Sequence, residues 1–295
     1  REARKIVEDA RAEVAALVGV RSAQVIFNGG STEGNNTILS GYQDKNVLIA
    51  AVEHPSVIEA APRADRIPVT KNGLVDLEKF ETMLKSAQTD LVCVQLVNSE
   101  TGVIQPVAQI AALAHEHGAR VHCDAVQAAG RIALNFKALD VDYLTLSAHK
   151  FGGPQGVGAL VFREGLQMPK LLRGGGQEKR QRAGTENVAG IAGFGTAAKL
   201  ALQELEHYQA RTKAFQDTLE RGLKTLANDL VIVGEASPRV ANTTCALLPD
   251  APAETQLMAM DLEGVAVSSG SACSSGTFKP SHVLEAMGYG DAGAK

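Results

Sequence analysis

The chain has 295 residues, of which 45% are hydrophobic and 21% charged, a balance that is typical of a globular protein and excludes wholesale disorder. The formal net charge is -4 and tryptophan is absent, so neither charge nor aromatic content favours a nucleic acid as partner. Apolar runs such as Leu91–Val97 are far too short to cross a bilayer, and we expect no membrane partner. This length suits one large or two moderate domains.

The first twenty residues have a charged, helical pattern and lack the apolar core of a signal peptide. The widely spaced cysteines form no C-x-x-C pair, which favours a reducing, cytoplasmic location. Three of them lie inside apolar strand patterns and are expected in the core: Cys93, Cys123 and Cys245. His115 and His117 stand two apart on an expected helix and do not share a face, so no metal site is predicted.

Short apolar runs alternate with helical patterns over most of the chain, which predicts an α/β fold with a mostly parallel sheet and helices on both faces. The clearest helix is Val107–His117, which Gly118 ends. Gly193 and Gly195 imitate a dinucleotide-binding fingerprint, but they lie in a helical pattern, so we interpret them as helix-packing residues. The expected strands are Gln24–Phe27, Val47–Val52, Leu91–Val97, Arg120–Asp124, Tyr143–Ser147 and Gly158–Phe162.

From about residue 187 the pattern changes, which indicates a smaller second domain. A long amphipathic helix is expected as far as about Leu226. It is followed by two strand-like runs, Leu230–Val233 and Thr243–Leu248, and by a helix near Glu254–Leu262.

Ligands of parallel sheets bind where the carboxyl ends of the strands meet, and several of the expected strands end in polar residues. The first runs into a small-residue turn with Ser31 and Thr32, which is either an anion site of backbone N–H groups and hydroxyls or an ordinary capped loop. His54 follows the second strand, where a histidine is either structural or catalytic. Asn98 follows the third, where it can serve turn chemistry alone. Asp124 ends the fourth and is either a buried acid with a partner or a helix cap.

The fifth strand ending carries the most chemistry. Ser147, His149 and Lys150 lie within four residues and precede a flexible glycine stretch. A lysine in a protected pocket can act as a nucleophile and form a Schiff base with a carbonyl, whereas most loop lysines are simply solvated. A phosphate-binding turn, an acid for a ring nitrogen and a lysine for an aldehyde are together the needs of pyridoxal phosphate (PLP).

These segments resemble the class V group of fold-type I PLP enzymes, and within it the cysteine desulfurases. The resemblance covers essentially the whole chain, and the order of its motifs is highly specific. The motifs are Gly30-Ser31-Thr32-Glu33, Glu53-His54-Pro55, Asn98-Ser99-Glu100-Thr101-Gly102, His122-Cys123-Asp124-Ala125-Val126-Gln127, Ser147-Ala148-His149-Lys150 and Arg182-Ala183-Gly184-Thr185.

A further motif separates the desulfurases from their aminotransferase relatives. Residues 268–276 are nine consecutive small, uncharged residues around Cys273, similar to the long cysteine loop of the desulfurases that serve iron–sulfur cluster assembly. Such a segment buries little apolar area and is costly to order, so it is suited to carrying a thiol from the active site to an acceptor protein. The alternative is that Cys273 packs in a turn.

The resemblance implies a role for each candidate residue. Cys273, Lys150 and His54 are the catalytic set: the thiolate that takes the sulfur, the Schiff-base lysine that also moves the α-proton, and the imidazole that stacks on the cofactor ring. Asp124 keeps the pyridine nitrogen protonated. The other implied cofactor ligands are Ser31, Thr32, Asn98, Gln127, Ser147, His149 and Thr185, and no metal is implied.

The implied reaction converts L-cysteine to L-alanine and leaves a persulfide on Cys273 for a sulfur-acceptor or iron–sulfur scaffold protein. Thr185 matches a threonine that reaches the partner subunit's phosphate, which implies a homodimer. The implied domains are a large PLP-binding domain over 1–200 and a small C-terminal domain over 201–295. Two other functions remain open: a related aminotransferase or selenocysteine lyase, and a scaffold without cofactor in a sulfur-transfer complex.

The chain departs from the family at both ends. No arginine follows Cys273, although the family clamps the substrate carboxylate with one beyond the cysteine loop. The family's N-terminal Asn-Ala-Thr turn also lies before Arg1. We therefore expect the sequence to be part of a longer protein, and we expect weak substrate binding or none if it is not.

Overall fold

The computed structural model describes residues 1–249, 251–269 and 281–290. Its centre is a seven-stranded sheet in the order β1-β7-β6-β5-β4-β2-β3. β7 pairs antiparallel with both β1 and β6, whereas the other pairs are parallel, so six strands point the same way. The strands are β1 Val25–Asn28, β2 Val47–Ala50, β3 Asp65–Ile67, β4 Leu91–Gln95, β5 Arg120–Asp124, β6 Tyr143–Ser147 and β7 Gly158–Phe162.

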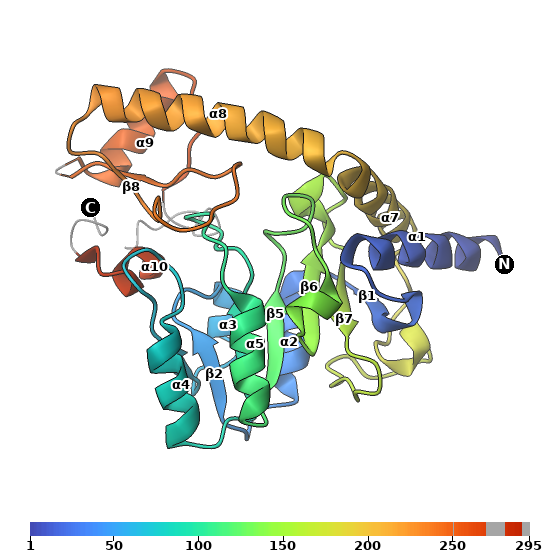
Figure 1. Ribbon diagram of the computed structural model, residues 1–295. Coiled ribbons are helices and arrows are strands. Elements are labelled where there is room, and N and C mark those ends of the chain that lie inside the picture. Colours follow the sequence, from blue (N-terminus) through green and yellow to red (C-terminus); the bar gives the residue numbers. More distant parts are fainter. Residues whose placement is uncertain (250, 270–280, 291–295) are drawn as a thin grey trace.

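Helices cover both faces of this sheet, with α4 and α5 on one face and α2 and α3 on the other (Figure 1). Successive strand residues point to opposite faces, so each strand feeds two separate cores. In β2, Leu48 and Ala50 join the larger core, while Ile49 joins the smaller core beneath α2 and α3. The helices are α1 Glu2–Val18, α2 Ser31–Ser40, α3 Pro55–Ile58, α4 Leu77–Ser86, α5 Val107–Glu116, α6 Phe136–Leu139 and α7 Val188–Gln203.

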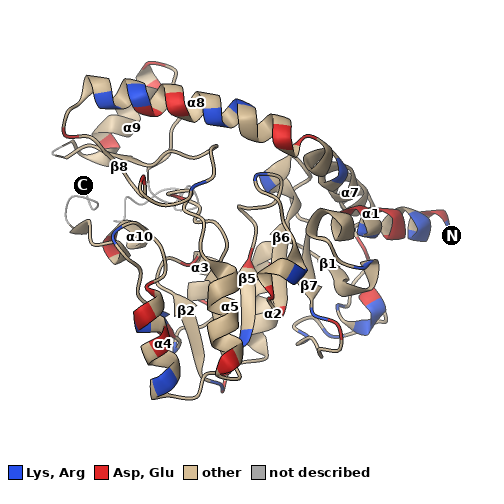
Figure 2. Ribbon diagram, viewed as in Figure 1, with Lys and Arg blue, Asp and Glu red and all other residues tan. Residues whose placement is uncertain are grey.

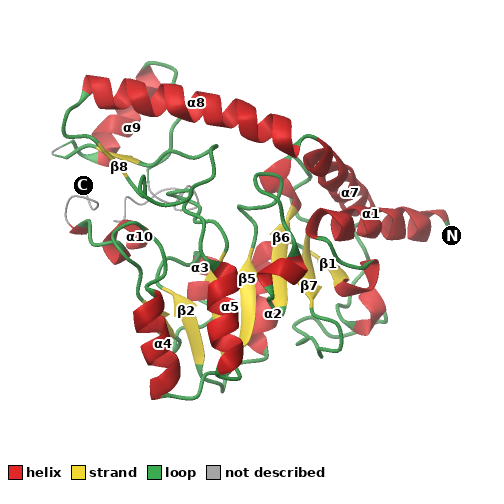
Figure 3. Cartoon of the chain, in the orientation of Figure 1, coloured by secondary structure: helices red, strands yellow, loops and turns green. Residues whose placement is uncertain are grey.

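The C-terminal part is built around a long helix, α8 (Leu205–Leu226), which runs along the top of the molecule above α9 (Ala253–Leu262) (Figures 1 and 3). A two-stranded sheet of β8 (Val231–Ile232) and β9 (Ala246–Leu247) accompanies them, and α10 (His282–Ala286) returns to the main sheet. Acidic and basic residues are interspersed along α8 (Figure 2).

The predicted α/β class and mostly parallel sheet are confirmed, and three strands have the predicted bounds. The expected single helix to Leu226 is wrong: α7 and α8 are separate helices that meet at Glu204. The second and third strands end earlier than predicted, at Ala50 and Gln95. Gln24 belongs to a 3-10 turn rather than to β1, and β3 and α10 were not predicted.

The two glycines of the false fingerprint lie inside α7, as expected. A Cβ on Gly195 would stand 2.6 Å from the Cα of Ala10, so this glycine lets α1 and α7 cross in close contact. Helix packing, and not nucleotide binding, therefore accounts for the pattern.

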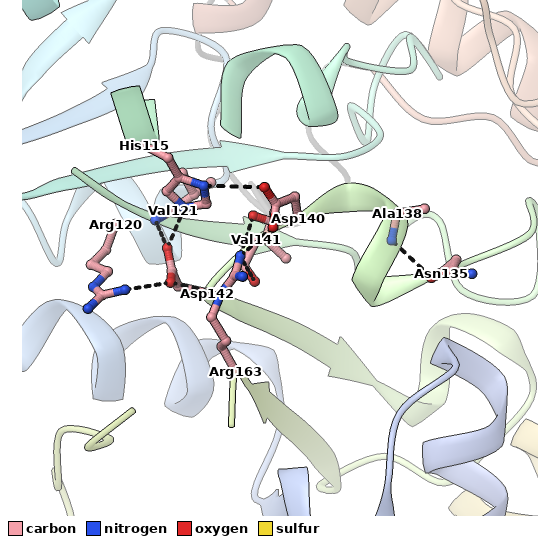
Figure 4. Close-up of polar contacts among 9 residues, drawn as sticks. All are labelled: His115, Arg120, Val121, Asn135, Ala138, Asp140, Val141, Asp142 and Arg163. Carbon is pink, nitrogen blue, oxygen red and sulfur yellow. Dashed lines mark hydrogen bonds and ion pairs between the residues drawn. The ribbon is translucent and has the colours of Figure 1, made fainter. Parts of the chain in front are cut away.

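An ion-pair cluster secures the amino-terminal edge of the sheet, opposite the predicted site (Figure 4). Asp142 is fully buried, and its carboxylate accepts hydrogen bonds from His115 Nε2 at 2.9 Å, Arg120 Nη1 at 3.1 Å and the Val121 N–H at 2.8 Å. These contacts tie α5 and β5 to the start of β6, so His115 has a structural role.

Within the described ranges, no group of three or more His, Cys, Asp or Glu could hold a metal, and no helix is long and apolar enough to span a membrane.

Candidate active site

The fold brings three chemically different side chains to the carboxyl edge of the sheet. Asp124 is the last residue of β5, His54 follows β2, and Lys150 follows β6. Electrostatic coupling links them, because the charges of His54 and Lys150 both act on the Asp124 carboxyl. These three strand ends meet at one edge of the sheet, as the alternation of strands and helices predicts.

Asp124 is a buried acid rather than a helix cap. Its Oδ2 accepts a hydrogen bond from Asn35 Nδ2 at 2.8 Å, and its Oδ1 accepts one from the Val126 N–H at 3.0 Å. Burial raises the pKa of the Asp124 carboxyl, while these two donors and the positive charges of His54 and Lys150 act in the opposite direction. A cation beside this carboxyl would further favour its ionised form.

His54 is the N-cap of α3, and Pro55 takes the first helical position, where a missing N–H costs nothing. Its Nδ1 accepts the Ser56 N–H at 3.1 Å and lies 2.8 Å from the Ser56 hydroxyl. Burial lowers the pKa of the His54 imidazole; Asp124 opposes this effect, and Lys150 and His282 add to it. The imidazole therefore favours its neutral form.

Lys150 lies in a short 3-10 turn, Ala148–Phe151, which ends at Gly152 with φ 88°, a conformation that favours glycine. The Lys150 carbonyl accepts a hydrogen bond from Arg131 Nη2 at 3.3 Å, which holds the turn against the segment after β5. Lys150 is half-buried, and its charge acts on Asp124, His54 and His149.

The start of α2 has the features of an anion site. Gly30 precedes the helix with φ 139° and offers no side chain to cap its first N–H groups. Ser31 is half-buried there and Thr32 is exposed. Near the end of β6, Ser147 Oγ lies 2.9 Å from His149 Nδ1, and burial lowers the pKa of His149, with Lys150 adding to the effect.

Two predicted ligands use their side chains within the protein. Asn98 Oδ1 accepts the Glu100 N–H at 3.0 Å and the Thr101 N–H at 2.9 Å, which is the turn chemistry that the sequence left open. Gln127 Oε1 contacts the guanidinium of Arg131. Both residues border the site, but these contacts occupy their amide oxygens.

Thr185 is exposed on a segment that two ion pairs fix to the body of the molecule. Arg11 Nη1 lies 2.6 Å from Glu178 Oε2 in a buried pair, and Arg182 Nε lies 2.8 Å from Glu33 Oε1 on α2. Residues 178–180 all have positive φ values between 43° and 65°, so this path is strained and needs such anchors.

Of the cysteines, Cys93 and Cys123 are buried, as predicted, and Cys245 is half-buried against the core. Burial raises the pKa of all three thiols, that of Cys245 to about 12, so none is a ready thiolate. Cys273 lies outside the described residues.

Sequence reasoning missed three buried polar residues around the site: Asn35, Glu53 and Ser56. Asn35 has a detectable signal, because it shares a helical face with Ile38 and Leu39, where a polar side chain needs a partner. Glu53 and Ser56 flank His54 and gave no such signal.

Comparison with known proteins gives this site a family. The class-V aminotransferase family model matches residues 1–290. The cysteine desulfurase IscS of Dictyoglomus turgidum is 38% identical over 97% of this chain and 76% of its own length. A cysteine desulfurase of Gluconacetobacter diazotrophicus is 39% identical over 94% of this chain and 73% of its own. The chain belongs to the cysteine desulfurases of the class-V aminotransferase family.

Solved structures agree with this family. A NifS-like protein from Rickettsia africae superposes with a TM-score of 0.92 and 38% identity over 100% of this chain and 81% of that one. DndA from Streptomyces lividans superposes with a TM-score of 0.83 and 31% sequence identity, over 99% of this chain and 86% of that one. The fold is therefore the fold-type I architecture, and enzymes of this family depend on PLP.

Proposed function

We propose that this protein removes sulfur from L-cysteine, releases L-alanine and carries the sulfur on Cys273 toward iron–sulfur cluster assembly. The observation that carries the proposal is the meeting of Asp124, His54 and Lys150 at one sheet edge. The names of the relatives support the activity, and SspA, which is 25% identical with a TM-score of 0.83, has been solved in complex with cysteine.

The residues present fit PLP. Lys150 offers an amine for the aldehyde, and Asp124 offers a buried carboxyl for the ring nitrogen. The uncapped start of α2 offers N–H groups for the phosphate, with the hydroxyls of Ser31 and Thr32 beside it. Ser147 ends β6 and His149 follows it. In the sheet, β6 is separated from β1, the strand before α2, only by β7, so both side chains are available to the same phosphate. When bound, PLP serves as an electron sink for the substrate carbon.

The protein's own groups then have separate tasks. Lys150 Nζ would hold the cofactor covalently and, when its amine is free, would move the proton from the substrate α-carbon. The Asp124 carboxyl would hold the ring nitrogen and favour the protonated form of that nitrogen. The neutral His54 imidazole would contact the ring and exchange protons with the substrate.

Cys273 completes the chemistry. Its thiolate attacks the substrate sulfur, forming an S–S bond while the C–S bond breaks. The electron pair of the C–S bond remains on carbon, which takes a proton and leaves as alanine. The sulfur stays on Cys273 as a persulfide, which an acceptor protein with its own thiolate can take up by the same exchange.

The test compares Cys273→Ala with Lys150→Ala in the full-length protein. We expect Cys273→Ala to retain the yellow bound cofactor but to lose persulfide formation and sulfide release from cysteine. We expect Lys150→Ala to lose the visible absorption of the lysine-bound cofactor. Sulfide release that persists in Cys273→Ala would overturn the function in favour of a related aminotransferase or selenocysteine lyase. Wild-type protein that stays colourless after reconstitution with PLP would favour a scaffold role.

A further inference from the structure

A continuous chain of hydrogen bonds joins the acid and the imidazole of the site. Asn35 Nδ2 donates to Asp124 Oδ2 at 2.8 Å and also to Ser56 Oγ at 2.9 Å. Ser56 Oγ in turn lies 2.8 Å from His54 Nδ1. The chain therefore runs Asp124, Asn35, Ser56, His54, across β5, α2 and α3, and we call it the Asn35–Ser56 relay.

Every link of the relay has a fixed direction. The Ser56 backbone N–H can only donate, so His54 Nδ1 accepts it, and the imidazole proton of the neutral ring resides on Nε2. Ser56 Oγ already accepts from Asn35, and its own proton points to the same Nδ1 lone pair. Protonation of Nδ1 would confront the Ser56 backbone N–H with a second N–H and would require the hydroxyl to turn from donor to acceptor.

The Asn35 amide donates to both neighbours and leaves its own oxygen without a hydrogen bond among the described residues. The side chain is fully buried, and the oxygen concerned is Oδ1. Turning the amide over would place that oxygen against the Asp124 carboxylate and leave Ser56 Oγ without its donor. An orphaned oxygen is tolerated because both amide hydrogens are used.

We propose that Ser56 and Asn35 are positioning residues that hold His54 as the Nε2–H tautomer and couple its orientation to the carboxylate of Asp124. Only the effect of this arrangement on catalysis rests on the proposed function. The geometry itself belongs to the protein without cofactor or substrate. In the working site, the relay presents a proton donor, Nε2–H, where the substrate is handled, and it keeps Nδ1 out of proton exchange.

The first experiment reads the tautomer directly. Nitrogen-15 NMR of histidine-labelled protein without cofactor should show His54 with a protonated Nε2 and an acceptor Nδ1. In Ser56→Ala the hydroxyl donor to Nδ1 is lost while the backbone N–H remains. The Nδ1 signal should therefore shift and the pKa of His54 should rise, because the neutral ring loses one of its two donors. Asp124, Lys150 and His282 also act on this imidazole and stay in place. Ser56→Thr keeps a hydroxyl and should restore the wild-type signals.

The matched control is Ser40→Ala. It removes the 2.7 Å hydrogen bond from the Ser40 hydroxyl to the Thr37 carbonyl, and both of these residues lie on α2, the helix that carries Asn35. It should leave the His54 signals unchanged. A wild-type His54 protonated on Nδ1, or identical His54 signals in Ser56→Ala and wild type, would overturn the proposal. Because these readouts need no turnover, an inactive wild type would count against the proposed function and not against the relay.

The second experiment tests the coupling. In the loaded enzyme, Ser56→Ala should lower kcat roughly 10-fold with little change in KM. This is less than the roughly 10²–10⁴-fold of a whole general acid–base group, because His54 itself remains. Asn35→Ala should do the same, and the double variant should be no worse than either single one, because both interrupt one chain. Multiplicative losses would show two independent residues and would contradict the coupling.

Discussion

At the scale of single residues, Glu53 has the most unusual environment. It is buried beside His54, its Oε1 accepts the Gln95 N–H at 2.6 Å, and its Oε2 has no hydrogen-bond partner among the described residues. Burial and the nearby Asp124 charge raise the pKa of Glu53 to about 8. Glu53 therefore holds its proton near pH 7 and adds no negative charge beside Asp124.

Glu53→Gln should make the pH dependence of stability visible. The folded protein retains the Glu53 proton between about pH 4.5 and 8, whereas the unfolded chain loses it, so wild-type stability contributed by this group falls as the pH rises through that window. Glutamine has no proton to lose. The variant should gain stability relative to wild type from pH 5 to 8.5, by at most roughly 5 kcal/mol. The free energy of unfolding, measured with urea at several pH values, checks this. The same dependence on pH in the variant and in wild type would contradict it.

Residues at strand ends were the predictable part of the site. Asp124 and Lys150 follow apolar runs whose carboxyl ends must meet, so their order along the chain sufficed to place them together. Asn98 shows the limit, because its position at a strand end is right, yet its amide oxygen serves its own turn. Asn35 and Ser56 act through contacts between α2, β5 and α3, which no local pattern specifies.

At the scale of elements, the crossing of α1 and α7 shows how one glycine sets a helix contact. Gly195 of α7 meets the backbone of Ala10, while Gly222 of α8 has open space around its Cα. Both are glycines inside helices, so their propensity cost is the same. Their surroundings differ only through tertiary packing.

Alanine substitution should therefore have opposite effects at the two positions. Gly195→Ala forces a methyl group to within 2.6 Å of Ala10 and should destabilise the protein by about 1–3 kcal/mol. Gly222→Ala adds helix propensity without a clash and should stabilise it by up to about 1 kcal/mol. Thermal or denaturant unfolding of the two variants checks this, and a common sign for both would refute the packing argument.

At the scale of the whole molecule, the segment with Thr185 points to an assembly. Thr185 is exposed, yet the ion pairs Arg11–Glu178 and Arg182–Glu33 fix the path that presents it. An ordered, strained and exposed loop is expected where another subunit contacts it. We propose a homodimer in which Thr185 serves the phosphate site of the partner subunit.

Mixed dimers test that arrangement. Lys150→Ala and Thr185→Val homodimers should each be impaired in binding or using PLP. If Thr185 acts across the interface, their heterodimer contains one site with both defects and one intact site, so cofactor occupancy and activity should return to about half of wild type. If Thr185 acted within its own subunit, both sites would be defective and nothing would be restored. Light scattering establishes the dimer itself.

The sequence by itself determined the fold class, the order of the site motifs and the strands Arg120–Asp124, Tyr143–Ser147 and Gly158–Phe162, because apolar periodicity and chain order are local properties. It did not determine where α7 ends, because the apolar periodicity continues across the break at Glu204. The direction of the Asn35–Ser56 relay was likewise decided only by tertiary structure. Hydrogen bonds between elements distant in the chain depend on distances that exist only once those elements have packed together.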